Sequence, residues 1–332
     1  MRPRARLHRV ILCLAGFAVA ACILPWFGAE PLSAESIMRF VQGENTVEGF
    51  IFFHQRIPRV LLALLVGGSL AMAGVALQVL FRNPLAEPWT LGVAGGASVG
   101  AFIAVVAPAI HFSVGPLATS QCLALTGALL VLGMVYLLAR SPKGFASHTL
   151  LLAGITIGIL SGGIIMLISY FISPYEFLSF HRWMVGGVDA VGYSDLFSFL
   201  VLGVPGWVLL ASQTREFNHL ALGIDMALGQ GVDVQRTRNV AILGAGLVTA
   251  AAVSVTGPIG FVGMLIPHAT RALVGVDHRA VVPSAFALGG IALAVCDTFA
   301  RTILAPTELP VGIITAVVGA PVFLLLLIRM GR

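Results

Sequence analysis

The stretch RVLLALLVGGSLAMAGVALQVL, residues 59–80, decides the fold of this chain. It contains no charged side chain after Arg59. A helix that crosses a bilayer needs about 20 mostly apolar residues, and this stretch provides them. Similar apolar stretches lie on both sides of it. The sequence therefore predicts an all-α polytopic membrane protein with about ten spans, at 10–29, 59–80, 91–108, 116–139, 149–172, 194–212, 240–256, 260–274, 281–304 and 311–328.

The composition of the whole chain agrees with a membrane protein. Its 332 residues are 58% hydrophobic and only 10% charged, whereas a soluble domain carries about 25% charged residues. The short connections leave no room for a soluble domain, so we expect residues 1–332 to form one membrane domain. The net charge of +5 is spread over many loops, and no face is basic enough to neutralise a phosphate backbone. No nucleic-acid partner is therefore expected.

The charges in the loops predict the orientation. With ten spans, 14 of the 19 Lys and Arg residues fall on one side of the membrane. The positive-inside rule assigns this side, with both termini, to the cytoplasm. The stretch 260–274 is the weakest span, but leaving it out would place Arg329 and Arg332 outside. The basic start and the box Val19–Cys22 also resemble a cleaved signal, but we expect the long apolar run there to be the first span.

No catalytic motif is recognisable. The chain lacks a G-x-x-x-x-G-K-[ST] phosphate loop, and its one lysine, Lys143, lies in RSPKGF. H-E-x-x-H and G-x-S-x-G motifs are missing, and none of the four cysteines forms a C-x-x-C pair. We interpret His268 as a capping or packing residue. The sequence therefore predicts no catalytic residue, no metal site and no directly bound cofactor.

Asp297 is the acidic residue that lies within a predicted span. An ionisable group at membrane depth is costly and suggests a function such as a proton relay. However, Arg301 lies four residues later, which is the helical spacing of an ion pair. We favour this structural pair, near the outer end of its span, over a proton relay.

The longest cytoplasmic connection, 213–239, is unusually apolar for a loop. Leu220, Leu222, Met226 and Leu228 alternate with glycines and aspartates, which predicts two short helices joined at glycines. A passive linker would not need this apolar content. We interpret the loop as a docking surface for a cytoplasmic partner.

Three glycines, Gly154, Gly158 and Gly162, follow one another at helical spacing in the span 149–172. Small residues in such a stripe let helix backbones approach closely. The stripe fits packing within the chain and a subunit or pore interface equally well.

Several strings, taken in order, resemble the permeases of bacterial ATP-binding-cassette importers for iron chelates and vitamin B12, the FecCD type. The resemblance covers roughly residues 55–328 and rests on RIPR (56–59), LFRNPLAEPWTLGVAGGASVGA (80–101), LLLAG (150–154), GPIGFVGMLIPHATR (257–271), DHR (277–279), CDTFAR (296–301) and ELPVGIITAVVGAPVFLLLL (308–327). It implies a homodimer in the bacterial inner membrane. It also implies two cytoplasmic ATPase subunits that use ATP and Mg²⁺, and an extracytoplasmic solute-binding protein, either periplasmic or lipid-anchored.

The resemblance also implies roles for individual residues. Arginines of the family that engage acidic residues of the binding protein correspond to Arg56, Arg59 and Arg301. The ATPase-docking helices correspond to 217–236, with the coupling residues Leu220, Gly223, Asp225, Ala227, Gly229 and Gly231. The cytoplasmic gate corresponds to Asn83 and Leu85, with a second layer at Ser147 and His148. The family's pathway runs between the subunits along spans five and ten, which favours the interface role for the glycine stripe.

The expected mechanism is alternating access, in which ATP binding and hydrolysis move the docking helices and open the inner gate. The expected cargo is a metal chelate, with an iron complex (ferric siderophore or haem) favoured and cobalamin as the alternative. A secondary carrier driven by protons or sodium remains the leading rival. That rival predicts paired acids or broken helices at the bilayer midplane, which Asp297 alone does not supply.

Overall fold

The computed structural model describes residues 3–107, 110, 112–141, 144–145, 147–189 and 192–330. Its elements follow one another as α1 (Pro3–Ile23), η1 (Leu24–Trp26), α2 (Ala34–Val41), α3 (Val47–Ile51), a π-helical turn η2 (Phe52–Arg56), α4 (Ile57–Phe81), η3 (Pro88–Leu91), α5 (Val93–Val106), α6 (Thr119–Ala139), β1 (Arg140–Ser141), β2 (Gly144–Phe145), α7 (Ser147–Ser169), α8 (Pro174–Met184), α9 (Ser194–Ser212), α10 (Thr214–Leu222), α11 (Ile224–Gly229), α12 (Val234–Thr256), α13 (Val262–Val274), α14 (His278–Thr302) and α15 (Val311–Met330).

Ten apolar helices confirm the predicted fold class. In the described ranges, seven helices are long and apolar enough to cross a membrane, and α5, α13 and α15 are shorter apolar helices. Together they coincide with the ten predicted spans. Helix α5 is shorter than the predicted 91–108, because Gly92 has a φ of 71° and separates it from the turn η3. The two-residue strands β1 and β2 pair with each other, which the all-helical prediction did not include.

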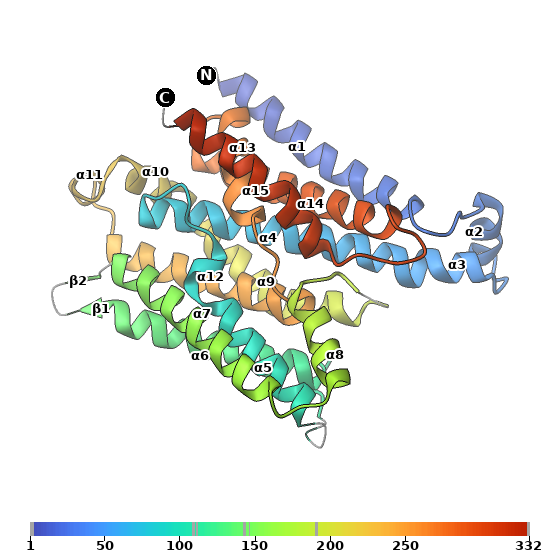
Figure 1. Ribbon diagram of the computed structural model, residues 1–332. Coiled ribbons are helices and arrows are strands. Elements are labelled where there is room, and N and C mark those ends of the chain that lie inside the picture. The colour runs from blue at the N-terminus through green and yellow to red at the C-terminus, as the bar shows by residue number, and fades with distance from the viewer. Residues whose placement is uncertain are drawn as a thin grey trace.

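The two ends of the helix bundle carry different connections. In Figure 1 both termini and helices α10 and α11 lie at one end, and α2, α3 and α8 lie at the other. This arrangement agrees with the orientation predicted from charge, in which the termini and 213–239 are cytoplasmic. Helix α8 follows span five as a short helix at the outer end, and a capping box between Ser173 and Glu176 begins it.

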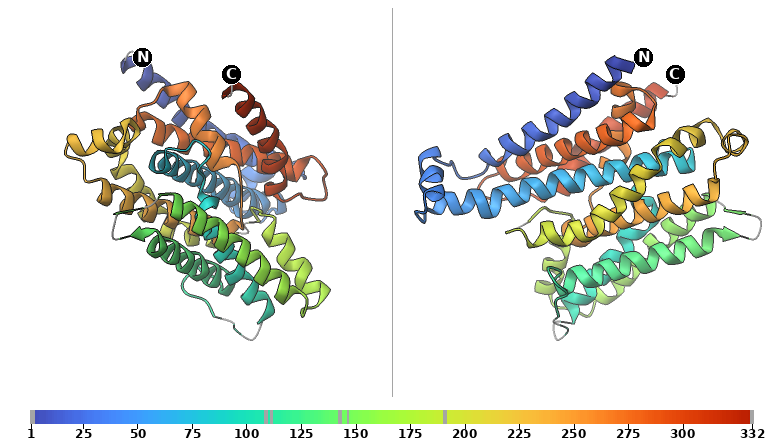
Figure 2. Two further views of the ribbon diagram at one scale, coloured as in Figure 1. Left: turned by 60° about the vertical axis from the view of Figure 1, so that its left-hand side comes forward. Right: turned by 180° about the vertical axis from the view of Figure 1, so that it is seen from behind.

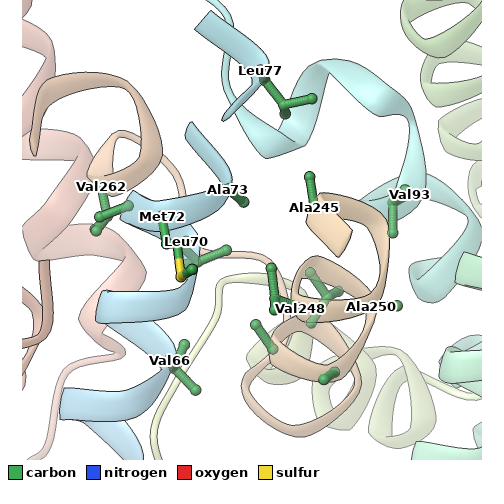
Figure 3. Packing of buried hydrophobic residues seen from close by; sticks show 14 of the residues in the cluster. Val66, Leu70, Met72, Ala73, Leu77, Val93, Ala245, Val248, Ala250 and Val262 are labelled. Atoms are coloured by element: carbon green, nitrogen blue, oxygen red, sulfur yellow. The ribbon is translucent and has the colours of Figure 1, made fainter. Parts of the chain in front are cut away.

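Helix α4 runs through the centre of the bundle and is buried along almost its whole length. It packs against α9, α12, α13 and α14, which come from the second half of the chain. Val66, Leu70 and Leu77 of α4 belong to one buried hydrophobic cluster with Val248 of α12 and Val262 of α13, part of which is drawn in Figure 3. The core of the protein is therefore built around this one helix.

Glycines let the backbones around α4 come close together. A Cβ atom added to Gly74 would lie 1.8 Å from the carbonyl oxygen of Gly263 in α13, and one added to Gly67 would lie 2.3 Å from that of Gly289 in α14. Both distances are far below van der Waals contact. Helices in lipid associate largely through such close packing, since burial of apolar surface gives them little advantage over lipid.

We expect Gly74→Ala to destabilise the protein, because the added methyl group would push α13 away from α4. Overpacking of this kind typically costs about 1–3 kcal/mol. The matched control is Gly133→Ala in α6, where a Cβ would meet no atom within 4 Å. The apparent Tm in detergent should fall for Gly74→Ala and stay level or rise for Gly133→Ala. Equal values for the two variants would contradict the tight α4–α13 contact.

Candidate functional site

The three arginines assigned to the outer face come together at one cavity. Arg56, Arg59 and Arg301 line a space of ≈330 Å³ between the outer ends of α4 and α14. The carboxylates of Glu30, Asp189 and Glu308 line the same cavity. Acidic and basic groups are therefore mixed here, and the cavity is not a purely positive surface.

Asp297 holds the centre of this cluster. Its side chain is only 1% exposed, and Arg59 reaches it with Nη2 at 3.0 Å and Nε at 3.1 and 3.2 Å from its two oxygens. The predicted pair with Arg301 is also present, at a longer 3.8 Å. The sequence did not predict that Arg59 is the closer partner, because 238 residues separate it from Asp297.

Arg59 also forms an outward ion pair. Its Nη1 atom lies 2.6 Å from Oε2 of Glu308, whose side chain is 44% exposed. One guanidinium thus bridges a buried carboxylate and a carboxylate that faces water. Only the outer of these two pairs is open to exchange with a carboxylate from another protein.

Arg56 and Arg301 are held inside the protein. Arg56 is the last residue of the π-helical turn η2 before α4, and such turns often occur at functional sites. Its guanidinium donates to the backbone carbonyl oxygens of Trp26, at 3.2 Å, and Glu30. Arg301 donates to Oγ1 of Thr298, at 3.2 Å. Both arginines are buried, so their expected contact with a binding protein stays a prediction that would require rearrangement.

The inner face carries the two short helices predicted in 213–239. Helices α10 and α11 meet at Gly223, whose φ of 126° is disfavoured for other residues, and Gly231 ends the pair with a φ of 78°. Leu220 and Ala227 are buried against the bundle. Leu222, Met226 and Leu228 point outward, and each is more than half exposed. Asp225 and Gly229 are exposed as well. The pair thus presents an apolar surface to the cytoplasm.

Asp277 links these helices to the rest of the inner face. One of its oxygens lies 2.5 Å from Nη1 of Arg6 in α1, and the other accepts a hydrogen bond of 2.9 Å from Asn218 in α10. The same Asp277 caps α14. Burial raises the pKa of this carboxyl, but the bonds from Asn218 and the backbone of Arg279, with the charge of Arg6, hold the pKa below its ordinary value. It therefore stays charged at cytoplasmic pH.

Sequence reasoning missed this inner network. The string DHR at 277–279 was assigned to the family pattern without a role, since its partners lie 59 and 271 residues away. A cavity of ≈720 Å³ lies beside the network and reaches Arg82 and Pro84 next to the predicted gate. Arg271 donates to Gln78 at the wall of this cavity, and Gln78 donates to the carbonyl of Met264.

The predicted gate lies where α4 ends. Asn83 accepts a hydrogen bond from the backbone N–H of Leu85 at 2.9 Å, which forms a tight turn, and Leu85 is exposed. Arg82 precedes this turn with a left-handed φ of 49°. For the second gate layer, Ser147 and His148, the side chains lie outside the described residues. Neither gate assignment is tested, and both stay predictions.

The glycine stripe of α7 divides into two parts. Gly154 is buried against the turn before α5, where an added Cβ would lie 2.1 Å from the carbonyl oxygen of Thr90. At Gly158 and Gly162 an added Cβ would meet no atom within 4 Å. The first glycine therefore serves packing within the chain, and the other two leave a surface open.

A metal site is not formed by the residues described. Within those ranges, no group of three or more His, Cys, Asp or Glu side chains could hold a metal ion. The four cysteines are all free.

Comparison with known proteins agrees with these observations. The chain is 35% identical to the hemin transport system permease protein HmuU of Yersinia pestis, over 99% of this chain and 97% of that one. It is 36% identical to the vitamin B12 import system permease protein BtuC of Escherichia coli O157:H7, over 98% and 96%. A solved structure described as an inward-facing metal-chelate type ABC transporter aligns with a TM-score of 0.83 and 28% identity, over 98% of this chain and 99% of that one.

The pattern of the FecCD transport family matches residues 12–329, which is nearly the whole chain. The resemblance inferred from the sequence strings is therefore confirmed. The chain is an integral protein of the bacterial inner membrane and belongs to the FecCD transport family of ABC-importer permeases.

Proposed function

We propose that this chain is the membrane-spanning subunit of an importer that moves a metal chelate into the cytoplasm. Two copies would form the pathway, with two ATPase subunits on the inner face and a solute-binding protein on the outer face. The cargo we favour is an iron complex, either haem or a ferric siderophore, and cobalamin is the alternative. Relatives named for hemin and for vitamin B12 are similarly close to this chain.

The observation that carries the proposal is the pair of unlike surfaces at opposite ends of one bundle. The outer end contains a cluster of ionic groups, in which the exposed Glu308 forms an ion pair with Arg59. Charged pairs suit a transient partner, because they steer association and exchange readily. The inner end presents the apolar side chains of α10 and α11, which suit a lasting contact with the ATPase.

Two helices support a pathway between two copies of the chain. Ile159 and Met166 of α7, and Val317 and Leu325 of α15, are each more than 60% exposed. Gly158 and Gly162 add an open, small surface to α7. A second copy of the chain against α7 and α15 would cover part of these faces. The rest of such a pathway would then be lined by apolar groups that bind cargo weakly, so that it can leave.

The function is tested by reconstitution in liposomes with the ATPase and the binding protein of the same importer. We expect ATP-dependent uptake of the chelate with all three components and none when either partner is omitted. The variant Leu222→Asp/Met226→Asp should lose ATPase co-purification and transport, because burial of each side chain is worth about 1.5–3 kcal/mol. Met38→Asp/Val41→Asp, the same change on exposed side chains of α2 at the outer end, is the control and should keep ATPase co-purification. Uphill uptake by the chain alone on an ion gradient would instead support a secondary carrier.

A second prediction concerns the outer ion pair. Glu308→Gln should strengthen docking of the binding protein, because it frees Nη1 of Arg59 and leaves Asp297 in place. An exposed ion pair is worth about 0.2–1 kcal/mol, so Kd should fall by up to about fivefold. Glu35→Gln is the control, since Glu35 pairs with the exposed Arg39 of α2. If both variants bind alike, Arg59 is not part of the docking surface.

A third prediction concerns coupling across the inner face. Asp277→Asn keeps a good N-cap for α14 but loses the ion pair with Arg6. We expect the ATPase to stay bound while the number of cargo molecules moved per ATP falls. Arg6→Gln should act alike, and the double variant should be no worse than either single one, because the two residues form one interaction. Additive losses would show that the pair does not act as a unit.

A further inference from the structure

A groove on the membrane-facing side of the bundle is not explained by either docking surface. It encloses ≈420 Å³ between α1, α4, α9 and α14. Seen from behind, α1, α14, α4 and α9 lie in succession across one face (Figure 2), and each packs on the next. The groove is lined by apolar side chains from these helices, among them Leu14, Met72, Trp207, Val282 and Phe286.

The walls of the groove are fixed in place. The indole Nε1 of Trp207 donates to Oγ of the buried Ser69 at 2.6 Å. The ring of Trp207 meets that of Phe286 edge-on, with centroids 5.3 Å apart, and Phe17 packs against Phe286 at 5.7 Å. The groove is therefore preformed and does not depend on a flexible loop.

Two polar groups mark the cytoplasmic end of the groove. Thr214 begins α10, and Arg279 lies in the first turn of α14. Arg279 is exposed, and its guanidinium forms no hydrogen bond or ion pair with any part of the chain that the structure describes. The nearby Asp277 attracts this charge without pairing with the guanidinium, because its oxygens accept bonds from Arg6, Asn218 and the backbone N–H of Arg279. The exposed guanidinium of Arg279 is thus available to an anionic group beside an apolar groove.

The depth of the groove fits the inner half of a bilayer. Phe286 follows Arg279 by seven residues along α14, which at 1.5 Å per residue places it about 10 Å deeper. The hydrocarbon of one leaflet is about 15 Å thick, half of a core of about 30 Å. A charged group at the cytoplasmic boundary with an apolar channel leading inward is complementary to an anionic phospholipid.

We propose that this groove binds one anionic glycerophospholipid of the cytoplasmic leaflet. Its phosphate pairs with Arg279 and accepts a hydrogen bond from Thr214, and one acyl chain lies in the groove against Trp207 and Phe286. The site does not depend on the identity of the cargo. It places a lipid against the start of α14, next to the link between Asp277 and the docking helix α10.

Trp207 provides a direct test, because bromine atoms on an acyl chain quench a neighbouring indole. The full chain is reconstituted with Trp26, Trp89 and Trp183 replaced by Phe, so that Trp207 is the only tryptophan and its indole can be excited selectively over the tyrosines. Phosphatidylglycerol and phosphatidylcholine with dibrominated chains are titrated separately. We expect phosphatidylglycerol to reach half-quenching at about fivefold lower mole fraction, the factor that matches about 1 kcal/mol for one basic residue.

Two variants separate headgroup binding from access to the groove. Arg279→Gln should abolish the preference for phosphatidylglycerol, whereas Arg236→Gln, at the cytoplasmic start of α12, should preserve it. Ala211→Phe, at the groove wall, should displace the acyl chain and reduce quenching by both lipids. Native mass spectrometry tests the same site without the triple Trp substitution, in case that variant does not fold. The unsubstituted chain should retain one phosphatidylglycerol, and the Arg279→Gln variant should retain none.

Other outcomes would overturn the proposal. Equal quenching by the two lipids would mean that the groove holds ordinary boundary lipid without recognition. A preference that survives Arg279→Gln would place the headgroup elsewhere. Absence of quenching by either lipid, together with a bound protein chain at this face, would show that another helix fills the groove.

Discussion

No charged side chain lies between Arg59 and Arg82, so this part of α4 is held in the bundle mainly by close packing, with hydrogen bonds at Ser69 and Gln78. The backbone of α4 directly contacts the backbone of α13 at Gly74 and that of α14 at Gly67. In lipid such contacts replace the hydrophobic driving force that packs soluble proteins. Because α4 is fixed in this way, its two ends have defined positions. Arg59 is placed at the outer cluster, and the turn at Asn83 is placed at the inner face.

Helix α14 connects the polar groups of the two faces. Near its outer end Asp297 receives Arg59, and at its inner start Asp277 receives Arg6 and Asn218. A buried ion pair has a large desolvation cost, so its contribution to stability is small while the loss of one partner is severe. We interpret the main role of the buried Arg59–Asp297 pair, and of the part-exposed Arg6–Asp277 pair, as fixing the register of α14. They connect α14 to α4 at the outer face, and to α1 and α10 at the inner face.

Three consecutive residues at the start of α14 face three different surroundings. Asp277 lies in the inner network, and His278 is buried against Asn218 and Phe217 of the docking helix α10. Arg279 lies at the mouth of the membrane-facing groove. Successive side chains of a helix point about 100° apart, so the residues of one turn can contact different parts of the structure. The inner end of α14 is thus where docking helix, bundle and lipid meet.

The sequence by itself determined the membrane class, the ten apolar helices, the orientation, the family, and the short helices α10 and α11. Each depends on local composition or spacing, such as the run 59–80 or the glycines around α10. Only the tertiary structure decided that Arg59 is the main partner of Asp297, that Asp277 joins α1 to α10, and that Gly154 packs while Gly158 and Gly162 stay open. Those relations join residues far apart in the chain. An apolar sequence does not reveal which faces of its helices will meet.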